Sequence, residues 1–308
     1  MSDVGSRAVD GVHVARAAQL ACILEASAPK PGNVSPGRPF DDLRYEDFVA
    51  SAIAIGRAFE DAGTQPVGRT VRAAIESTLE WAPSNTNLGI VLLLAPLARA
   101  VIGVGGHFWR TVAAADCHPK MTSDPNLRSR VREVLSETTV DDAREVYAAI
   151  RLARPGGLGR ADAQDVADEP TRTLLEVMRL AADRDTIASE YASAFELTFG
   201  TGVPALDRAR RDGLQWDDAI VETFLTLLAR KADTHIVRRT GADAAGEVSR
   251  QARHALDAGG VRSVAGRHAI DDMNRSMRDA RNSLNPGTTA DVTTAAIFVE
   301  LVARGFRA

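Results

Sequence analysis

The sequence predicts an all-α protein that forms one multi-helix globular domain. Apolar residues recur at helical spacing through most of the chain, and no run alternates apolar and polar residues as a half-buried strand would. Aromatic residues are only 5% of the 308 residues, and Ala, Leu and Val supply most of the apolar content, which favours closely packed helices. No linker, repeat or low-complexity stretch divides the chain, so we expect a single domain over residues 1–308 with no significant sheet.

The expected helices follow from this periodicity in chain order. In the first, Val9, Val12, Leu20 and Ile23 recur at helical spacing, with Arg16 the one polar exception. The helices are expected at about 7–27, 46–62, 66–82, 87–104, 128–137, 141–153, 171–199, 217–239, 243–257, 263–281 and 289–305. Gly and Pro mark loops at about 28–40, 63–66, 82–86, 154–160, 200–204 and 282–288.

Several classes of protein are disfavoured by composition. The net charge of -4 argues against a nucleic-acid-binding surface. The most apolar run, Leu88 to Gly106, contains Pro96 and Arg99 and reads as a buried helix, so no membrane span is expected. The chain opens on a polar segment without the apolar core of a secretory signal. Cys22 and Cys117 form no disulfide or metal pattern, which favours a cytoplasmic protein.

The least regular region, 105–127, contains two histidines. His107 and His118 are not accompanied by a carboxylate pattern that would complete a zinc site. We therefore expect a surface loop there.

Three short polar turns lie at predicted helix ends. They read Lys30-Pro31-Gly32-Asn33, Ser84-Asn85-Thr86-Asn87-Leu88-Gly89 and Asn285-Pro286-Gly287-Thr288-Thr289-Ala290-Asp291. A polar turn that leads into a helix presents free backbone N–H groups and a positive dipole end, which suit phosphate. Three such turns in one helical chain predict a pocket for a polyanionic substrate.

Three aspartates interrupt apolar helical stripes and are candidate catalytic residues. Asp185 falls in the stripe of helix 171–199, Asp233 in that of 217–239, and Asp291 shares a face with Ala295 and Phe298. A buried carboxylate must be paired, hydrogen-bonded or metal-bound, and Mg²⁺ prefers oxygen ligands. Asp185 and Asp233 are thus candidate ligands of a Mg²⁺–triphosphate complex.

Structural alternatives remain open for these aspartates. Asp291 follows Thr288 at capping-box spacing and could only secure a helix start. Asp185 and Asp233 could pair with Arg184, Arg239 or arginines elsewhere.

Other polar residues of the turns are candidates for nucleotide binding. Lys30 is one of three lysines, and its compact charge suits phosphate, although it could be a solvated loop lysine. Asn33, Asn85 and Asn87 could bind ribose or a base edge, or could only cap helices. Gly157, within Gly156–Gly159, could approach a phosphate, but no strand precedes it as in a dinucleotide fingerprint.

These residues stand in an order that resembles the triphosphoribosyl-dephospho-coenzyme-A synthase family. The matching pieces are Glu25 with Pro29–Val34, Asp47-Phe48, Ser51-Ala52, Asn85-Thr86 with Gly89, Gly156–Gly159, Asp165-Val166, Ala181–Asp185 with Ile187-Ala188 and Tyr191, Asp233-Thr234, Asn285–Gly287 and Ala290-Asp291. The resemblance covers roughly residues 15–305. It implies an all-α fold and transfer of the triphosphoribosyl group of ATP to the 2′-hydroxyl of 3′-dephospho-CoA, with release of adenine.

The resemblance also suggests roles at the site. Cleavage of the ribose–adenine bond passes through an oxocarbenium-like centre, which a carboxylate can stabilise. Asp185 and Asp233 would serve the metal or this centre, and Asp291 would be the base. Lys30 and Mg²⁺ would anchor the triphosphate, and the nucleotide contacts would come from Asn33, Asn85, Asn87, Gly157, Arg184 and Asn285.

The second turn departs from the family pattern. Familiar members read Asn-Thr-His-Lys-Gly there, whereas this chain reads Asn85-Thr86-Asn87-Leu88-Gly89 and resembles a branch from organisms with methanopterin-type one-carbon carriers. A ribosyl or phosphoribosyl transferase that makes such a carrier is therefore an alternative. A helical nucleotide-binding protein without turnover is another.

Overall fold

The computed structural model describes residues 10–82, 84–102, 125–279 and 281–306, and the predicted all-α class is confirmed for this part of the chain. The only β-type pairing recorded among these residues is an isolated bridge between Ser35 and Arg38. The region discussed above for His107, Cys117 and His118 lies almost wholly outside the described residues. None of the described helices has the length and apolar character needed to cross a membrane.

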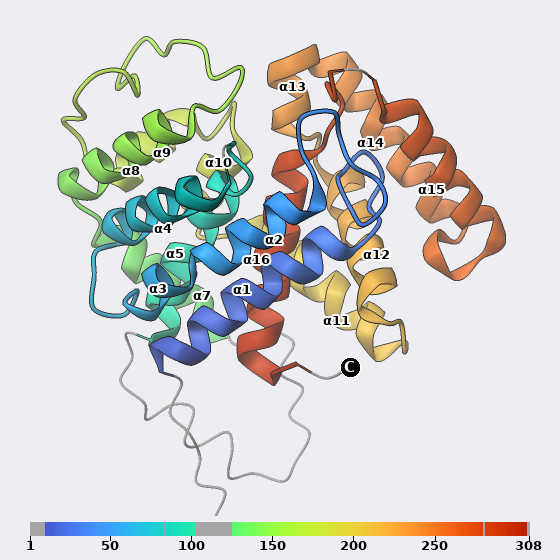
Figure 1. The fold of residues 1–308 in the computed structure, drawn as a ribbon, viewed down its shortest axis with the longest axis horizontal. Coiled ribbons are helices and arrows are strands. Elements are labelled where there is room, and N and C mark those ends of the chain that lie inside the picture. The colour runs from blue at the N-terminus through green and yellow to red at the C-terminus, as the bar shows by residue number, and fades with distance from the viewer. Residues whose placement is uncertain (1–9, 83, 103–124, 280, 307–308) are drawn as a thin grey trace, which may run out of the picture.

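The helices follow one another in the order shown in Figure 1. They are α1 (Gly11–Ser27), α2 (Tyr45–Ala54), α3 (Gly56–Glu60), α4 (Val67–Trp81), α5 (Leu88–Ile102), α7 (Pro125–Ser136), α8 (Val140–Ala153), α9 (Leu174–Ala181), α10 (Thr186–Ser193), the π-helical turn η1 (Thr198–Gly202), α11 (Val203–Arg211), α12 (Trp216–Arg230), α13 (Thr234–Thr240), α14 (Ala242–Asp257), the 3₁₀ turn η2 (Gly260–Arg262), α15 (Val264–Met277) and α16 (Gly287–Arg304).

Helix α16 lies at the centre of the fold. It runs between a group that contains α4, α5, α8, α9 and α10 and a second group that contains α11 to α15, while α1 and α2 cross in front (Figure 1). It packs against α1, α5 and α12, and every residue from Val292 to Val302 is buried. One continuous cluster of buried apolar side chains includes residues from α1 to α16.

Two long helices expected from the sequence are broken, each at one of the candidate aspartates. The helix expected at 171–199 is interrupted after α9, and Asp185 adopts extended backbone angles as the N-cap of α10. The helix expected at 217–239 ends at Arg230, and Asp233 is the N-cap of α13. An aspartate can end one helix and start the next because its side chain accepts the free N–H groups of the new first turn. The helix expected at 46–62 is also broken, at Ile55.

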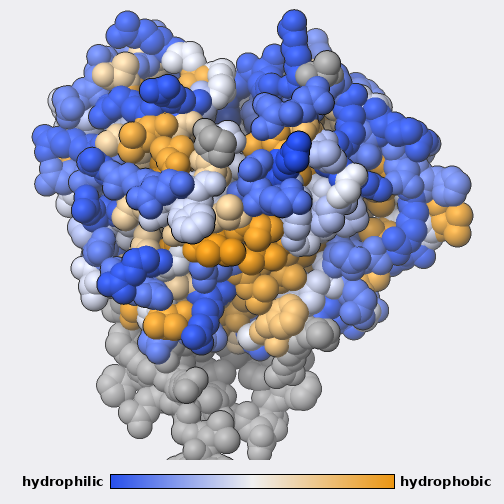
Figure 2. Space-filling model, in the orientation of Figure 1, coloured by the Kyte–Doolittle hydropathy of each residue, from blue (hydrophilic) through white to orange (hydrophobic). Residues whose placement is uncertain are grey.

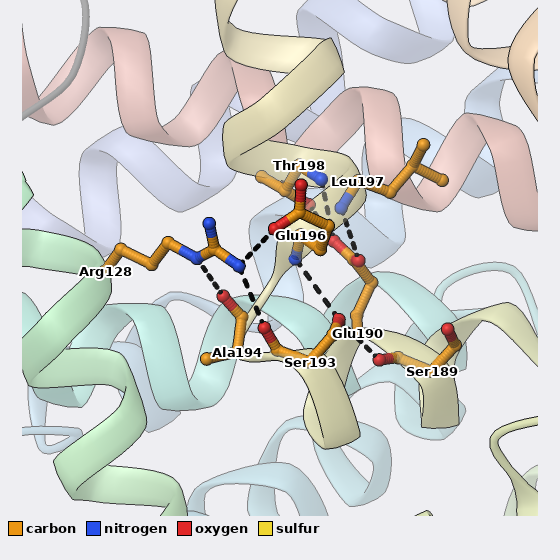
Figure 3. Close-up of polar contacts among 8 residues, drawn as sticks. All are labelled: Arg128, Ser189, Glu190, Ser193, Ala194, Glu196, Leu197 and Thr198. Carbon is orange, nitrogen blue, oxygen red and sulfur yellow. Dashed lines mark hydrogen bonds and ion pairs between the residues drawn. The ribbon is translucent and has the colours of Figure 1, made fainter.

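The loop expected at 200–204 is wrong, because η1 and α11 run through it. The chain turns earlier, at Ala194 and Phe195, which both have positive φ angles. Figure 3 shows how side chains hold this turn. The buried carboxylate of Glu190 accepts hydrogen bonds from Leu197 N, Thr198 N and Thr198 Oγ1 at 2.8, 2.8 and 2.5 Å.

From α7, Arg128 reaches the same turn (Figure 3). Its guanidinium donates to the carbonyls of Ala194 and Ser193 at 2.8 and 3.0 Å and pairs with Glu196. Arg128 thus satisfies the backbone carbonyls of Ser193 and Ala194, which stabilises the C-terminal end of α10.

Replacing Glu190 by Gln should lower the free energy of unfolding by about 2 kcal/mol, because an amide cannot accept from all three donors that the carboxylate serves. Thermal melts followed by circular dichroism measure the change. The matched control is Glu196→Gln in the same turn, whose side chain is 63% exposed and should contribute less than about 1 kcal/mol. Equal melting temperatures for the two variants would contradict this account of the turn.

Candidate active site

The loops and helix ends at one edge of the molecule enclose a cavity of about 1250 Å³. Its lining comes from the end of α1, the turn before α5, the segment after α8, the start of α10, helix α13 and the start of α16. The two groups of helices rise on either side of a notch at the top of the surface in Figure 2. Pockets for drug-sized ligands typically have volumes of roughly 300–1,000 Å³, so this cavity is larger than that range.

The cavity brings together most of the residues singled out in the sequence. Its lining includes Asn33, Asn85, Asn87, Gly157, Arg184, Asp185, Asn285 and Asp291. Lys30 and Asp233 are not part of that lining. The three polar turns therefore do converge, but the three aspartates do not all face one space.

Beneath the cavity, three helix N-termini meet at a cluster of buried polar side chains. Asp233 accepts from His235 N and Ile236 N at 2.8 and 3.2 Å, which caps α13. Its other oxygen accepts from Thr289 N and Thr289 Oγ1 at 2.6 and 2.7 Å, in the first turn of α16.

Thr234 connects this cluster to α10. Its hydroxyl accepts from Thr186 N at 3.1 Å and contacts the hydroxyls of Thr186 and Thr288. Burial raises the pKa of Asp233, and the four donated hydrogen bonds act in the opposite direction. Asp233 thus ties together the helix starts that carry the other candidate residues.

Asp185 stands at the cavity wall and is already paired. One oxygen accepts from Ala188 N at 3.0 Å as the helix cap, and the other is 2.5 Å from Arg238. The expected partners Arg184 and Arg239 do not make this contact; Arg238, one helical turn after Thr234, does. The alternative of an ion-paired capping aspartate is therefore observed for Asp185.

Asp291 is different, because no described residue donates a hydrogen bond to its carboxyl group or pairs with it. It does not cap α16, since the helix already begins at Gly287, and the capping-box alternative is wrong. A Cβ atom at Gly89 would lie 2.0 Å from Asp291 Oδ2, so only glycine lets the first turn of α5 approach this carboxyl so closely. Burial raises the pKa of Asp291 well above its ordinary value, and the nearby charge of Glu25 raises it further.

Lys30 contacts a carboxylate of the protein, whereas the sequence predicted a contact with phosphate. Its side chain is 1% exposed, and Nζ lies 3.0 Å from a Glu25 carboxylate oxygen. The ammonium also donates to the carbonyls of Ala28, at 3.1 Å, and Glu25. Glu25, in the last turn of α1, lines the cavity. Lys30 therefore does not line the cavity itself but forms an ion pair with a carboxylate that does.

The asparagines of the turns combine structural contacts with free acceptors. Asn85 accepts from Leu88 N at 3.1 Å and starts α5, and Asn33 donates to the Pro31 carbonyl at 3.3 Å. Asn87 donates to Thr78 Oγ1 at 3.0 Å, but its buried Oδ1 accepts no hydrogen bond from the described residues, and neither does Oδ1 of Asn285. Unsatisfied buried acceptors in a cavity wall suit hydrogen-bond donors of a ligand such as ribose hydroxyls.

The expected pair of Mg²⁺ ligands is not assembled. Both oxygens of Asp185 and both oxygens of Asp233 accept hydrogen bonds within the protein. Within the described ranges, no group of three or more His, Cys, Asp or Glu side chains could hold a metal. Asp185 and Asp233 therefore do not fit a dedicated protein site for Mg²⁺.

Residues of α13 that the sequence reasoning missed also line the cavity. Burial, aided by the charges of Arg238 and Arg239, lowers the pKa of His235 to about 4, so its imidazole is neutral at neutral pH. Its Nδ1 would lie 2.4 Å from a Cβ at Gly287, which shows how closely α16 approaches it. These residues were overlooked because the predicted helix 217–239 was continuous, so nothing marked a helix start there.

Several positively charged side chains also line the cavity. Six arginines contribute to its lining: Arg151, Arg154, Arg184, Arg238, Arg239 and Arg281. Arg239 is oriented by its bonds to the carbonyls of Arg281 and Asn282 at 2.7 and 3.3 Å, and Arg184 is exposed. Such a group can bind several anionic oxygens at once.

Comparison with known proteins shows the family of this chain. The family described as ATP:dephospho-CoA triphosphoribosyl transferase matches residues 12–308, nearly the whole chain. The chain belongs to this family. All the cavity residues named above lie within the matched range.

Curated relatives match over a shorter part. The chain is 31% identical over 98 residues to a probable 2-(5''-triphosphoribosyl)-3'-dephosphocoenzyme-A synthase from Pseudomonas savastanoi, covering 32% of this chain and 33% of the relative. A protein of the same name from Azotobacter vinelandii is 30% identical over 99 residues, 32% of this chain and 33% of the relative. These alignments span about a third of the length of the curated relatives.

A solved structure shares the fold. The crystal structure of a presumed triphosphoribosyl-dephospho-CoA synthase from Archaeoglobus fulgidus superimposes with a TM-score of 0.62 at 25% identity. The superposition covers 86% of this chain and all of that one. The overall fold is thus common to the two proteins.

The contacts of Asp233 and Asp291 predict opposite effects of Asp→Asn on the apo protein. Asp233→Asn should lower the free energy of unfolding by about 3 kcal/mol, because an amide cannot accept all four donated hydrogen bonds. Asp291→Asn should raise it by roughly 0.5–2 kcal/mol at neutral pH, because a carboxyl without a partner is costly to bury.

The gain from Asp291→Asn should depend on pH. Because the folded-state pKa is raised, ionisation in the unfolded state progressively destabilises the wild-type fold as pH rises above 3.8. The gain should therefore be small near pH 3.8 and grow toward neutrality. Denaturant melts at several pH values measure this gain in stability, with Asp42→Asn at the exposed rim of the cavity as the control. A loss of stability in Asp291→Asn as well as in Asp233→Asn would show that Asp291 is structural.

Proposed function

We propose that this protein transfers the triphosphoribosyl group of ATP to the 2′-hydroxyl of 3′-dephospho-CoA and releases adenine. Family membership over residues 12–308 supports the activity, and the observation that carries it is one large cavity whose lining contains both six arginines and the carboxyl groups of Glu25 and Asp291. The arginines of the cavity suit the phosphates of two nucleotide substrates. The carboxyl groups of Glu25 and Asp291 suit the positive sugar centre that forms as adenine leaves.

The geometry suggests how the nucleotide lies. Phosphate oxygens would contact Arg184, Arg238 and Arg239. Gly157 also lines the cavity and lies beside Arg238, so it would be near these phosphates. The ribose would then extend toward Asp291 and the start of α5. Hydrogen bonds from its hydroxyls would reach the free oxygens of Asn87 and Asn285.

We propose that Mg²⁺ enters bound to the triphosphate as part of the substrate. Mg²⁺ usually keeps several waters and needs only one or two carboxylates beside substrate phosphates, so a dedicated protein cage is not required. A cytoplasmic location remains part of the proposal. Nothing in the family match favours an acceptor of the one-carbon-carrier type or a nucleotide-binding protein without turnover.

Incubation of the protein with ATP, Mg²⁺ and dephospho-CoA should yield free adenine and a product heavier than dephospho-CoA by the triphosphoribosyl group. Chromatography with mass detection measures both, and parallel reactions without the acceptor or with excess EDTA test the roles of acceptor and metal. Binding of ATP without any adenine, even at stoichiometric protein concentration, would contradict the proposed activity.

Removing Arg184 should weaken ATP binding by about one to two decades, because a charge-assisted hydrogen bond contributes roughly 1.5–3 kcal/mol. Calorimetric titration of Arg184→Ala measures the change. Arg172→Ala is the matched control, since Arg172 is an exposed arginine in the same part of the chain that does not line the cavity. Equal ATP affinities for the two variants would place the phosphates elsewhere.

A further inference from the structure

We propose that Asp185 is a positioning residue whose carboxylate orients the guanidinium of Arg238 toward the phosphates of the nucleotide. This inference rests on the proposed function for the identity of that nucleotide, and it gives Asp185 a role within that function. The sequence suggests Asp185 as a ligand of Mg²⁺ or a stabiliser of the sugar centre, whereas its contacts support a role that acts through an arginine.

The carboxylate of Asp185 is held in place by the helix that it caps. One oxygen, Oδ1, accepts from Ala188 N at 3.0 Å in the first turn of α10. The other oxygen, Oδ2, lies 2.5 Å from Arg238 Nη1. Because the cap holds the first oxygen, the start of α10 also sets the direction in which the second oxygen faces.

The two helices that carry this pair are joined at a second point. Thr186, the first residue of α10, donates its backbone N–H to the hydroxyl of Thr234 at 3.1 Å. Thr234 is the first residue of α13, and Arg238 follows it by four residues on the same face of the helix. Asp185 and Thr186 therefore contact two successive positions on one face of α13, which fixes the place of Arg238 relative to α10.

Within the described part of the chain, the orientation of the Arg238 guanidinium depends on Asp185. Nη1 donates to Asp185, whereas the buried Nε donates to no described residue and Nη2 has no acceptor among them either. Arg238 lines the cavity, so Nη2 is left to donate to anionic oxygens of a ligand. Arg239 differs, because it donates to the backbone carbonyls of Arg281 and Asn282 at 2.7 and 3.3 Å. Loss of the Asp185 carboxylate would therefore release Arg238 but not Arg239.

The ion pair contributes little to the stability of the fold. The side chains of Arg238 and Asp185 are 24% and 26% exposed, so solvent screens their attraction. A negative charge beside a phosphate site also repels the ligand. Orientation of the guanidinium is the compensating gain, because an arginine that is already ordered loses less conformational entropy when it binds phosphate.

The effect of Asp185→Asn on ATP affinity should depend on Arg238. In the wild-type background the substitution should weaken ATP binding by roughly 3–10-fold, because Arg238 keeps its charge but loses its fixed orientation. Arg238→Gln should weaken ATP binding by roughly 10–100-fold, because the charge-assisted contact with phosphate is lost. When Asp185→Asn is added to Arg238→Gln, affinity should stay equal or rise, because only the repulsion between the carboxylate and the phosphates is removed.

Calorimetric titration of the wild type, both single variants and the double variant forms a double-mutant cycle. The ligands are ATP and inorganic triphosphate, each with Mg²⁺, and the dependence on Arg238 should appear with both because the proposed contact is to phosphate. Asp42→Asn, at an exposed carboxylate on the rim of the same cavity, removes the same charge and should weaken neither ligand. Asparagine caps helices as well as aspartate does, so Asp185→Asn should fold, and Arg238→Met replaces Arg238→Gln if the latter does not.

Equal losses of affinity from Asp185→Asn with and without Arg238 would overturn the proposal, because Asp185 would then not act through the arginine. Tighter binding by Asp185→Asn in the wild-type background would also overturn it, since repulsion would then outweigh orientation. A dependence on Arg238 that appears with ATP but not with triphosphate would overturn the assignment to phosphate. The expected cycle without any release of adenine in the presence of dephospho-CoA would overturn the proposed activity but leave the role of Asp185 in phosphate binding.

Discussion

The buried carboxylate of Asp233 is the interaction on which the rest of the site depends. It accepts four hydrogen bonds from two helix starts, and Thr234 beside it joins a third. A helix N-terminus has N–H groups that need acceptors, so one carboxylate can hold two such ends together. The starts of α10, α13 and α16 therefore have fixed relative positions, and Asp185, His235 and Asp291 are presented from them.

Charge at the site is distributed unevenly, and this asymmetry is what gives the cavity its chemical character. Asp185 and Glu25 each form an ion pair with a cation, whereas Asp291 forms no ion pair with any residue that the structure describes. Burying a carboxyl group without a partner lowers stability unless it stays protonated. A protein that maintains such a group in a cavity is giving up stability where reactivity is gained, as is common at active sites.

The buried pair of Lys30 and Glu25 illustrates how a binding motif can act indirectly. The turn Lys30–Asn33 does reach the cavity, but through Asn33 and through the carboxylate that Lys30 supports. In the proposed function, arginines of the α13 region and of the α9–α10 junction would contact the phosphates instead. Their planar groups can each contact two phosphate oxygens, which a lysine cannot do in a fixed geometry.

The sequence by itself determined the all-α class, most helix positions and the convergence of three polar turns, because helical periodicity and turn residues act locally. It did not reveal that Asp185 and Asp233 break helices, because an aspartate in an apolar stripe can face inward or cap a new helix, and only packing decides between them. The tertiary structure alone decided which carboxyl groups have cations. Lys30 pairs with Glu25 and Arg238 with Asp185, while Asp291 has no ion-pair partner in the described part of the chain, since these contacts depend on how α1, α13 and α16 meet.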